Sequence, residues 1–369
     1  QETKIEIFVV GGYIRDYLLN KHSDDLDFAV SASAQKFAKK LAHAVKGKYI
    51  VLHGERQIYR IAVFNNSGLK YIDVSMMQGK TILEDLKQRD FTLNALAVKI
   101  EHFDNIKKNL IDFFNCQSDI KNRQINIVSD KTFLTDPLRI LRAFRIAGEL
   151  NFKISKNTMS CMKKYSKIIT KSAPERIKNE FFRILDHPNA SEQIMLMEVS
   201  GVLEGLFPPV SMMKKSAKNF YYHPKGLFQH CFQTLQSFEK ILINLDKYFP
   251  DTKDRLSVHL HEKFSDNVNR ISLLKFIALF HDCAKPECAK KIGKKMRFLG
   301  HENLGAEKTA EIMKKLKMSN KEIDYAKKII SEHMRPSNLA KSQIITNKAR
   351  LKLFRDIKDN TPDVLLLAM

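Results

Sequence analysis

The sequence lacks several features that mark specialised classes of protein. It has no tryptophan and no repeat in which aromatic and basic residues alternate, which argues against a platform for stacking single-stranded bases. No apolar run reaches the ~18 residues needed to cross a bilayer, so membrane insertion is not expected. No internal repeat is evident along the chain.

Cysteine is also scarce, and its five occurrences are scattered without paired spacing. Such a pattern does not predict the disulfide framework of a small secreted protein, and no signal-peptide pattern is present. We therefore expect a cytoplasmic protein in a reducing environment. The cysteines are Cys116, Cys161, Cys231, Cys283 and Cys288.

Positive charge dominates what is present. The 63 Lys and Arg residues exceed the 41 Asp and Glu residues, which gives a formal net charge of +22. Basic pairs recur along the whole chain, and a polyanion that binds such a surface releases counterions, so RNA or DNA is the simplest partner. A lysine-rich proteome, in which surface positions default to lysine, is the alternative.

Apolar periodicity divides the chain into an α+β part and a helical part. The 369 residues are enough for roughly two to four domains. Helical spacing appears at 33–46 and 81–99, and from about residue 131 strand signals nearly vanish. Strand-like runs occur at 5–10, 26–30, 49–52, 59–64 and 70–74.

A linker is expected at Pro208-Pro209 and the Ser/Lys-rich stretch 211–219. We therefore predict an α+β fold in three regions, of which the second and third are all-α. These regions are a head at 1–130, a helical neck and body at 131–220, and a helical domain at 221–369.

The most informative stretch joins a glycine turn to closely spaced carboxylates. Gly11-Gly12 follows an apolar run, and such a turn at the start of a helix lets backbone N–H groups approach a triphosphate. Arg15 lies one turn further, where it can hold phosphate. Asp25 and Asp27 are two apart in a strand-like run, so they project from the same face.

Two carboxylates on one face form an oxygen-rich site for Mg²⁺, and Asp73 at the end of another strand-like run is a candidate third. This set suits a two-metal nucleotidyl transfer, in which the metals activate a hydroxyl and stabilise leaving pyrophosphate. We assign catalysis to Asp25, Asp27 and Asp73, and metal binding to the first two. The alternative is an exposed strand end beside an ordinary turn.

Two further segments place arginine beside carboxylate. Arg89 is a candidate phosphate ligand, Asp90 a candidate partner for a sugar hydroxyl, and Asn94 lies about one helical turn further on the same side. An amphipathic helix with surface charge fits the spacing equally well.

Asp136 and Arg139 are neighbours on a predicted helix surface that begins at Pro137. Asp136 accepts hydrogen bonds and Arg139 donates them, so together they match the pairing edges of cytosine and adenine. Uracil and guanine present a carbonyl where Asp136 needs a donor, so they are excluded. The alternative is a capping aspartate in an intrahelical ion pair.

Six motifs, taken jointly, resemble the class II tRNA nucleotidyltransferase and bacterial poly(A) polymerase family over about residues 5–200. They are GGYIRD, DDLDF, QRDFTLNALA, IDFF with SDI, DPLRILRAFRIA and PERIKNEFFRIL. The resemblance implies a polymerase-β-like head, followed by a helical neck and body. It implies addition of nucleotides from CTP and ATP to the 3′ end of tRNA without a nucleic-acid template.

The resemblance also implies roles for particular residues. Metal binding falls on the aspartate pair, phosphate contact on the glycine turn and its arginine, and nucleotide contact or base selection on the arginine motifs. The residues implied in phosphate contact, nucleotide contact or base selection are Gly11, Gly12, Arg15, Arg89, Asp90, Asn94, Asp136, Arg139, Arg142 and Arg145.

Only 15 residues (74–88) separate Asp73 from Arg89. Family members that complete the whole CCA end usually have a longer flexible loop there, and CC-adding members typically have a shortened one. The resemblance leaves CC addition and full CCA addition open, with an A-adding or poly(A) polymerase role as a less favoured alternative.

The C-terminal part contains an adjacent His281-Asp282 at the end of an apolar helix. Imidazole and carboxylate side by side suit a transition metal or Mg²⁺, and His230 and His301 are candidate further ligands. This part resembles the HD superfamily of metal-dependent phosphohydrolases.

The closing aspartate of that superfamily's pattern is expected after a Leu/Ala-rich run such as 365–369, where the sequence ends. We expect that ligand to be lost by truncation, and Asp363 not to replace it. Two functions therefore remain open for this part of the chain. It is either a hydrolase that acts on cyclic or terminal phosphates of RNA ends, or a helical domain that only helps to hold tRNA.

Overall fold

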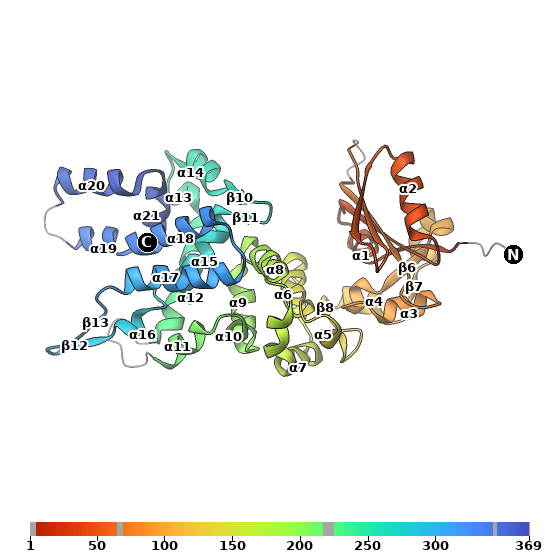
Figure 1. Cartoon of the computed structure of the whole chain (residues 1–369), viewed down its shortest axis with the longest axis horizontal. Coiled ribbons are helices and arrows are strands. Elements are labelled where there is room, and N and C mark those ends of the chain that lie inside the picture. Colours follow the sequence, from red (N-terminus) through yellow and green to blue (C-terminus); the bar gives the residue numbers. More distant parts are fainter. Residues whose placement is uncertain (1–4, 65–68, 217–224, 342–344, 369) are drawn as a thin grey trace. The chain divides into compact units, whose positions relative to one another are not determined.

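The computed structural model describes residues 5–64, 69–216, 225–341 and 345–368, which form two compact units (Figure 1). The head unit comprises the residues up to 139 together with 151–161, and the helical unit comprises 140–150 together with the residues from 162 onward. Within the described ranges, no helix is long and apolar enough to cross a membrane. All five cysteines are free thiols.

A seven-stranded sheet in the order β3-β4-β5-β2-β1-β6-β7 forms the centre of the head unit. The five strands predicted from the sequence are confirmed, each within two residues at its ends. The strands are β1 (Ile7–Val10), β2 (Asp25–Val30), β3 (Lys48–His53), β4 (Ile58–Ala62), β5 (Tyr71–Met76), β6 (Leu96–Lys99) and β7 (Ile111–Asp112).

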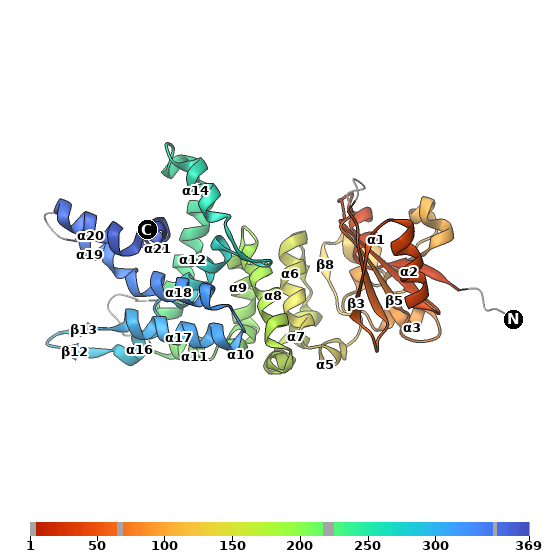
Figure 2. The same cartoon turned by 45° about the horizontal axis from the view of Figure 1, so that its top comes forward.

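The pairing of the central strands positions the carboxylates. β1 runs antiparallel to β2, with Val10 opposite Asp27, and β2 runs parallel to β5, with Asp27 beside Asp73. The helix α2 (Ala34–Ala44) packs on β4 and β5 (Figure 2), and buries Ala34, Ala38 and Ala42, which are spaced four apart. A central strand covered on both faces is apolar throughout, which explains the Phe8–Val10 run.

The helix expected over 81–99 is wrong beyond its first turns. The helix α3 (Ile82–Lys87) starts at Thr81, whose side chain accepts from the Glu84 N–H, but residues 92–94 form a 3₁₀ turn and β6 follows. A short apolar run is compatible with either a buried helix or a buried strand, and its periodicity alone does not distinguish them. Here β6 pairs with β1, so long-range pairing decided the outcome.

The largely helical character predicted beyond residue 131 is confirmed, with a break between α5 (Thr132–Thr135) and α6 (Arg139–Leu150). The prediction of a linker here is wrong in part, because residues 209–215 form the helix α11 (Pro209–Lys215). Proline is tolerated at the start of a helix, where the backbone N–H that it lacks would have no helical partner. Residues 217–219 of that linker lie outside the described residues. Other helices that matter below are α8 (Pro174–Asp186), α9 (Ala190–Val199), α12 (Leu227–Ile243), α14 (Lys253–Leu260), α15 (Arg270–Phe280), α16 (Lys285–Cys288), α17 (His301–Lys315), α18 (Asn320–Glu332) and α21 (Thr361–Ala368).

The core of the helical unit is built around α15, where only Ile271 escapes burial. Phenylalanine rings supply the large buried side chains that the absent tryptophan would otherwise provide. Phe276 stacks on Phe182 with ring centroids 5.6 Å apart, and Phe181 and Phe207 meet at 5.0 Å. The C-terminal end of α15 thereby delivers His281-Asp282 from a rigid support.

Candidate active site and metal centre

The glycine bend lies against one of the predicted metal ligands. Gly11 has φ +76°, in the region that favours glycine. A Cβ atom at Gly11 would lie 3.0 Å from Arg89 Nη1 and 3.2 Å from Asp27 Oδ2. Gly11, Asp27 and Arg89 therefore meet at one place, although they are far apart in the sequence.

The two aspartates of β2 lie on one face of the sheet. Leu26 between them is buried in the head core, whereas Asp25 is exposed and Asp27 is half-buried. This alternation is the one expected for a strand with a single solvated face. The pair presents carboxylate oxygens, the donor type that fits Mg²⁺.

Asp73 lies at the same register as Asp27, but the structure pairs it with an arginine that sequence reasoning missed. Arg60 on β4 donates from Nε to Asp73 Oδ1 at 2.8 Å and from Nη2 to Oδ2 at 2.7 Å. This carboxylate raises the pKa of Arg60. Within the described part of the chain, Asp25, Asp27 and Asp73 do not bring three ligand atoms within 4.8 Å of one another. The role of Asp73 as a third ligand stays a prediction.

A hydrogen-bonded chain holds Arg15 in place. Arg15 Nη1 donates to Asn94 Oδ1 at 2.7 Å, and Asn94 Nδ2 donates to Asp90 Oδ1 at 3.0 Å. Asp90 and Asn94 are only 5% and 7% exposed. Asn94 belongs to a 3₁₀ turn and not to the helix that the sequence predicted. The contacts nevertheless bring the side chains of Arg15, Asn94 and Asp90 together.

Arg89 is held by a second residue that sequence reasoning missed. Its Nη2 atom lies 3.1 Å from Oδ2 of the buried Asp85, one turn back along the chain. Asp85 Oδ1 also accepts from the Gln78 N–H at 2.9 Å, so this carboxylate joins the 74–88 segment to the arginine. An i, i+4 Asp–Arg spacing was the available signal.

Asp136 and Arg139 lie where α6 begins. Asp136 Oδ1 accepts from the Leu138 N–H at 3.2 Å, within the turn between α5 and α6. Arg139 donates from Nη2 to the Gln88 carbonyl at 2.7 Å and from Nη1 to Thr135 Oγ1 at 3.2 Å. Base selection by this pair stays a prediction.

Arg142 and Arg145 belong to the helical unit. Arg145 bonds Glu180 Oε2 from Nε and Glu149 Oε2 from Nη1, both at 2.7 Å, and so ties α6 to α8. Burial opposes its charge, but the two glutamates raise its pKa above the usual value. The contacts seen for Arg145 are structural, and its predicted place near the nucleotide stays a prediction.

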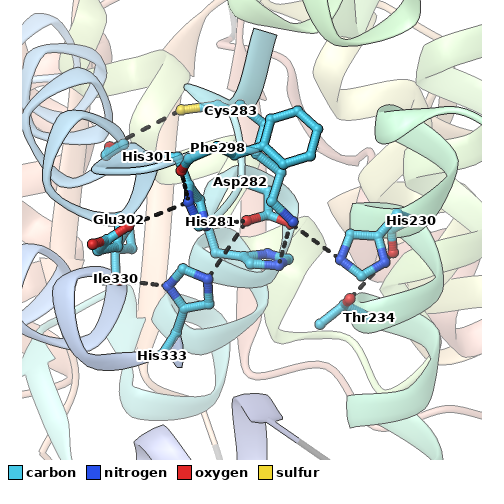
Figure 3. A network of polar contacts seen from close by, with 12 residues as sticks. His230, Thr234, His281, Asp282, Cys283, Phe298, His301, Glu302, Ile330 and His333 are labelled. Atoms are coloured by element: carbon cyan, nitrogen blue, oxygen red, sulfur yellow. Dashed lines mark hydrogen bonds and ion pairs between the residues drawn. The ribbon is translucent and has the colours of Figure 1, made fainter. Parts of the chain in front are cut away.

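Four histidines surround Asp282 in the helical unit (Figure 3). His230 Nε2 and His281 Nε2 lie 3.2 and 3.3 Å from Asp282 Oδ2, while His301 Nε2 lies 3.2 Å from Oδ1. His333, which sequence reasoning did not include among the ligands, lies 3.5 Å from Oδ1. The rings come from α12, from the ends of α15 and α18, and from the start of α17.

Backbone carbonyls orient three of these rings. The Nδ1 atoms of His281, His301 and His333 bond the carbonyls three residues earlier, at 2.9, 2.7 and 2.6 Å. A carbonyl only accepts, so each Nδ1 carries the hydrogen and a neutral ring turns an Nε2 lone pair toward Asp282. Lone pairs and a carboxylate at such distances repel one another unless a cation lies between them. The donor set therefore fits a divalent metal.

The pKa shifts of Asp282 and His281 favour the deprotonated forms that bind metal. Burial alone would raise the pKa of Asp282, but attraction to a charged His281, and hydrogen bonds from imidazoles whose Nε2 carries a proton when no metal is bound, hold it well below its usual value. Burial lowers the pKa of His281, although Asp282 opposes this effect. An ionised carboxylate and neutral imidazoles are the forms that bind metal.

Asp363 does not join this cluster. Its carboxylate is fully buried, with Arg270 Nη1 at 2.7 Å and His259 Nε2 at 2.9 Å. A cavity of about 710 Å³ adjoins the cluster and is also lined by Lys285, Arg297 and Lys341. Lys285 Nζ lies 2.5 Å from Asp282 Oδ2.

Replacing Asp282 with Asn, or His333 with Gln, is expected to lower the affinity for Ni²⁺ by about tenfold or more, because each removes a ligand. Isothermal titration calorimetry with Ni²⁺ separates this site from the carboxylate site of the head, since imidazole prefers a transition metal. His261→Gln, at an exposed histidine of the same unit, is the matched control. Unchanged Ni²⁺ affinity in both ligand variants would contradict the assignment.

Three family models match successive parts of the chain. They are described as "Poly A polymerase head domain", at residues 7–126, "Probable RNA and SrmB- binding site of polymerase A", at 151–213, and "HD domain", at 227–360. The last of these contains all four histidines around Asp282.

Curated relatives differ in the nucleotides that their names give. The CC-adding tRNA nucleotidyltransferase of Geobacter sulfurreducens is 36% identical over 198 residues, which cover 54% of this chain and 44% of that protein. The A-adding tRNA nucleotidyltransferase of Deinococcus radiodurans is 27% identical over 334 residues, covering 88% and 68%. The CCA-adding enzyme of Lactobacillus helveticus is 30% identical over 299 residues, covering 76% and 70%. The chain thus spans less than half of the first relative.

A solved structure described as a complex of CCA-adding enzyme with ATP shares the fold, with a TM-score of 0.67 and 21% identity. The likeness covers 99% of this chain and 75% of that one. The resemblance read from the six motifs and the HD-type histidines is thereby confirmed. This chain belongs to the family of tRNA nucleotidyltransferases and poly(A) polymerases, and carries an HD domain after its head and helical regions.

Proposed function

We propose that this chain adds cytidine nucleotides from CTP to the 3′ end of tRNA without a nucleic-acid template. The observation that carries the proposal is the meeting of Gly11, Asp27 and Arg89, with Asp25 on the same face of the sheet. Phosphate-binding backbone, metal-binding carboxylates and a cationic side chain are the parts that nucleotidyl transfer requires. The surplus of positive charge favours RNA as the acceptor.

Each residue has a distinct task in this proposal. Asp25 and Asp27 would hold Mg²⁺, which when bound activates the attacking hydroxyl and neutralises charge on the departing pyrophosphate. Gly11 and Gly12 leave room for the triphosphate, since a Cβ at Gly11 would fill the space beside Asp27 and Arg89. Arg15 and Arg89, held by Asn94 and Asp85, orient the phosphates. Asp136 and Arg139 select the base.

The short segment after Asp73 favours CC addition over completion of the CCA end. Residues 77–81 and the helix α3 fill the 74–88 interval beyond β5, and Gln78 and Lys80 donate backbone bonds to Asp85 and Glu84. Because these residues are held by α3 and by hydrogen bonds, few of them can form a flexible loop that adapts the site to ATP. Full CCA addition and A addition are the alternatives.

Product length distinguishes these specificities. Purified full chain is incubated with tRNA that ends at the discriminator base, with CTP and ATP supplied separately and together, and the products are separated on a sequencing gel. We expect two C residues with CTP and no further A when ATP is present. A terminal A after both C residues would show CCA addition, and extension only of tRNA that already ends in CC would show A addition. No extension under any condition would refute the proposal.

We also propose a second activity, the metal-dependent hydrolysis of phosphoesters at RNA ends by the cluster around Asp282. The specific observation is a carboxylate ringed by four histidines beside a cavity of about 710 Å³ that Lys285 and Arg297 also line. His230, His281, Asp282, His301 and His333 would hold the metal, which when bound supplies an activated water. Two readouts test this activity: release of inorganic phosphate from a 3′-phosphorylated RNA, and opening of a cyclic-phosphate end to a terminal monophosphate. Both should be lost on His281→Gln.

A further inference from the structure

A short basic hairpin projects from the helical unit beside α16 (Figures 1 and 2). It consists of β12 (Lys290–Ile292) and β13 (Lys295–Arg297), joined by Gly293 and Lys294. Its eight residues include five cations and no acidic residue. Residues 290–295 and 297 are all exposed, so the hairpin adds little to the core.

Repulsion between like charges destabilises this hairpin. Lys290 lies directly opposite Arg297 in the antiparallel register, and like charges at opposed positions repel. None of the five cations forms an ion pair with an acidic side chain of the described residues. A partner that carries negative charge at repeated intervals would relieve this repulsion.

The hairpin also leads to the histidine cluster. Met296 and Arg297 line the same cavity as Asp282 and His301. The next residue, Phe298, accepts a hydrogen bond from His301 Nδ1 at its carbonyl, at 2.7 Å. An extended anion lying along the hairpin would therefore have one end beside the metal-binding groups.

We propose that the hairpin 290–297 binds the phosphodiester backbone of a single-stranded RNA end and guides its terminal phosphate into the cavity beside Asp282. The cavity end of this path rests on the proposed phosphohydrolase activity, whereas backbone binding by the hairpin does not. RNA is favoured over an anionic membrane, because Ile292 is the only apolar side chain of the exposed strand positions. Arg297 at the cavity wall lies on the same face of the hairpin as Lys290 and Lys295, and these exposed cations can contact successive phosphates.

The test replaces four lysines of the hairpin with glutamine in the full chain and measures binding of a fluorescein-labelled single-stranded RNA with a 3′-phosphate. Fluorescence anisotropy at several salt concentrations gives the affinity and its salt dependence. The matched control replaces four exposed lysines elsewhere in the helical unit, so that net charge changes equally. The hairpin positions are Lys290, Lys291, Lys294 and Lys295, and the control positions are Lys240, Lys253, Lys314 and Lys315.

We expect the hairpin variant to bind this RNA about tenfold or more weakly, with a log–log salt slope shallower by roughly 2 to 3, since each single-strand phosphate contact contributes ~0.7. The control variant should keep both values, and both variants should keep CTP incorporation into tRNA. Loss of incorporation in every protein, including the unaltered chain, would instead refute the proposed transferase function.

Cross-linking gives a second readout. RNA carrying a photoreactive 3′-terminal nucleotide should label peptides from 289–299 in the unaltered chain. Equal weakening of RNA binding in both variants, labelling confined to other peptides, or preferential binding of the hairpin to anionic vesicles or polyglutamate would each overturn the proposal.

Discussion

Asp27→Asn is expected to abolish CTP incorporation into tRNA, with a fall in rate of about 10³-fold or more. The substitution keeps the size of the side chain but removes the charge that would hold Mg²⁺ beside the glycine bend. Asp27 Oδ2 is the carboxylate oxygen placed next to Gly11 and Arg89, so its loss strikes the centre of the proposed site. Incorporation of radiolabelled CTP at saturating tRNA and Mg²⁺ measures the effect.

The matched control is Asp24→Asn, which changes the same residue type three positions earlier. Asp24 is half-buried, with a side chain that is 41% exposed, and it pairs with Lys70 and His22 at the surface. We therefore expect incorporation to stay within roughly twofold of the unaltered chain. tRNA affinity and the thermal unfolding midpoint should be retained in both variants. Near-normal incorporation by Asp27→Asn would refute the metal assignment, and with it the proposed mechanism.

Lys275→Met is expected to destabilise the helical unit by about 3–5 kcal/mol, because the buried Glu239 keeps its hydrogen bond from the Ser191 N–H but loses its counter-charge. Lys275 is fully buried on α15, and its Nζ lies 3.0 Å from Glu239 Oε1 on α12. Nζ also donates to the His187 carbonyl at 2.6 Å, between α8 and α9. Burial lowers the pKa of this lysine, whereas Glu239 opposes the shift. The midpoint of urea unfolding, followed by circular dichroism, measures the loss.

A double variant separates an unpaired charge from a general packing defect. Lys275→Met combined with Glu239→Leu removes both charges together, so we expect it to recover much of the stability that either single substitution loses. Lys240→Met, at an exposed position of α12, should change stability by no more than about 0.5 kcal/mol. A double variant as unstable as the sum of the two singles would show that the pair is not coupled.

Local pattern was sufficient for the elements whose residues carry their own signal. The alternation around Leu26 predicted both the strand and the shared face of Asp25 and Asp27, because a strand has a period of two. The adjacent His281-Asp282 predicted a metal site for a similar reason, since both ligands come from one helix end. The joint order of six short motifs was enough to predict the family.

Contacts between distant segments decided the rest. Residues 96–99 carry an apolar run compatible with either a helix or a strand, and pairing with β1 made them a strand. Arg60 engages Asp73 only because β4 lies beside β5, and Asp85 holds Arg89 only because α3 ends where it does. Nothing local marked Arg60 as part of the site, whereas the i, i+4 spacing from Arg89 was a local signal for Asp85.

By itself, the sequence determined the family, the class of fold and the carboxylate and histidine–aspartate pairs, because these depend on residues close together in the chain. Only the tertiary structure decided that His333 completes the ring around Asp282, and that Asp363 pairs with Arg270 and His259 elsewhere. A metal site is assembled from several helices, and the distance between two side chains on different helices depends on packing. That packing cannot be read from the spacing of either residue in the sequence.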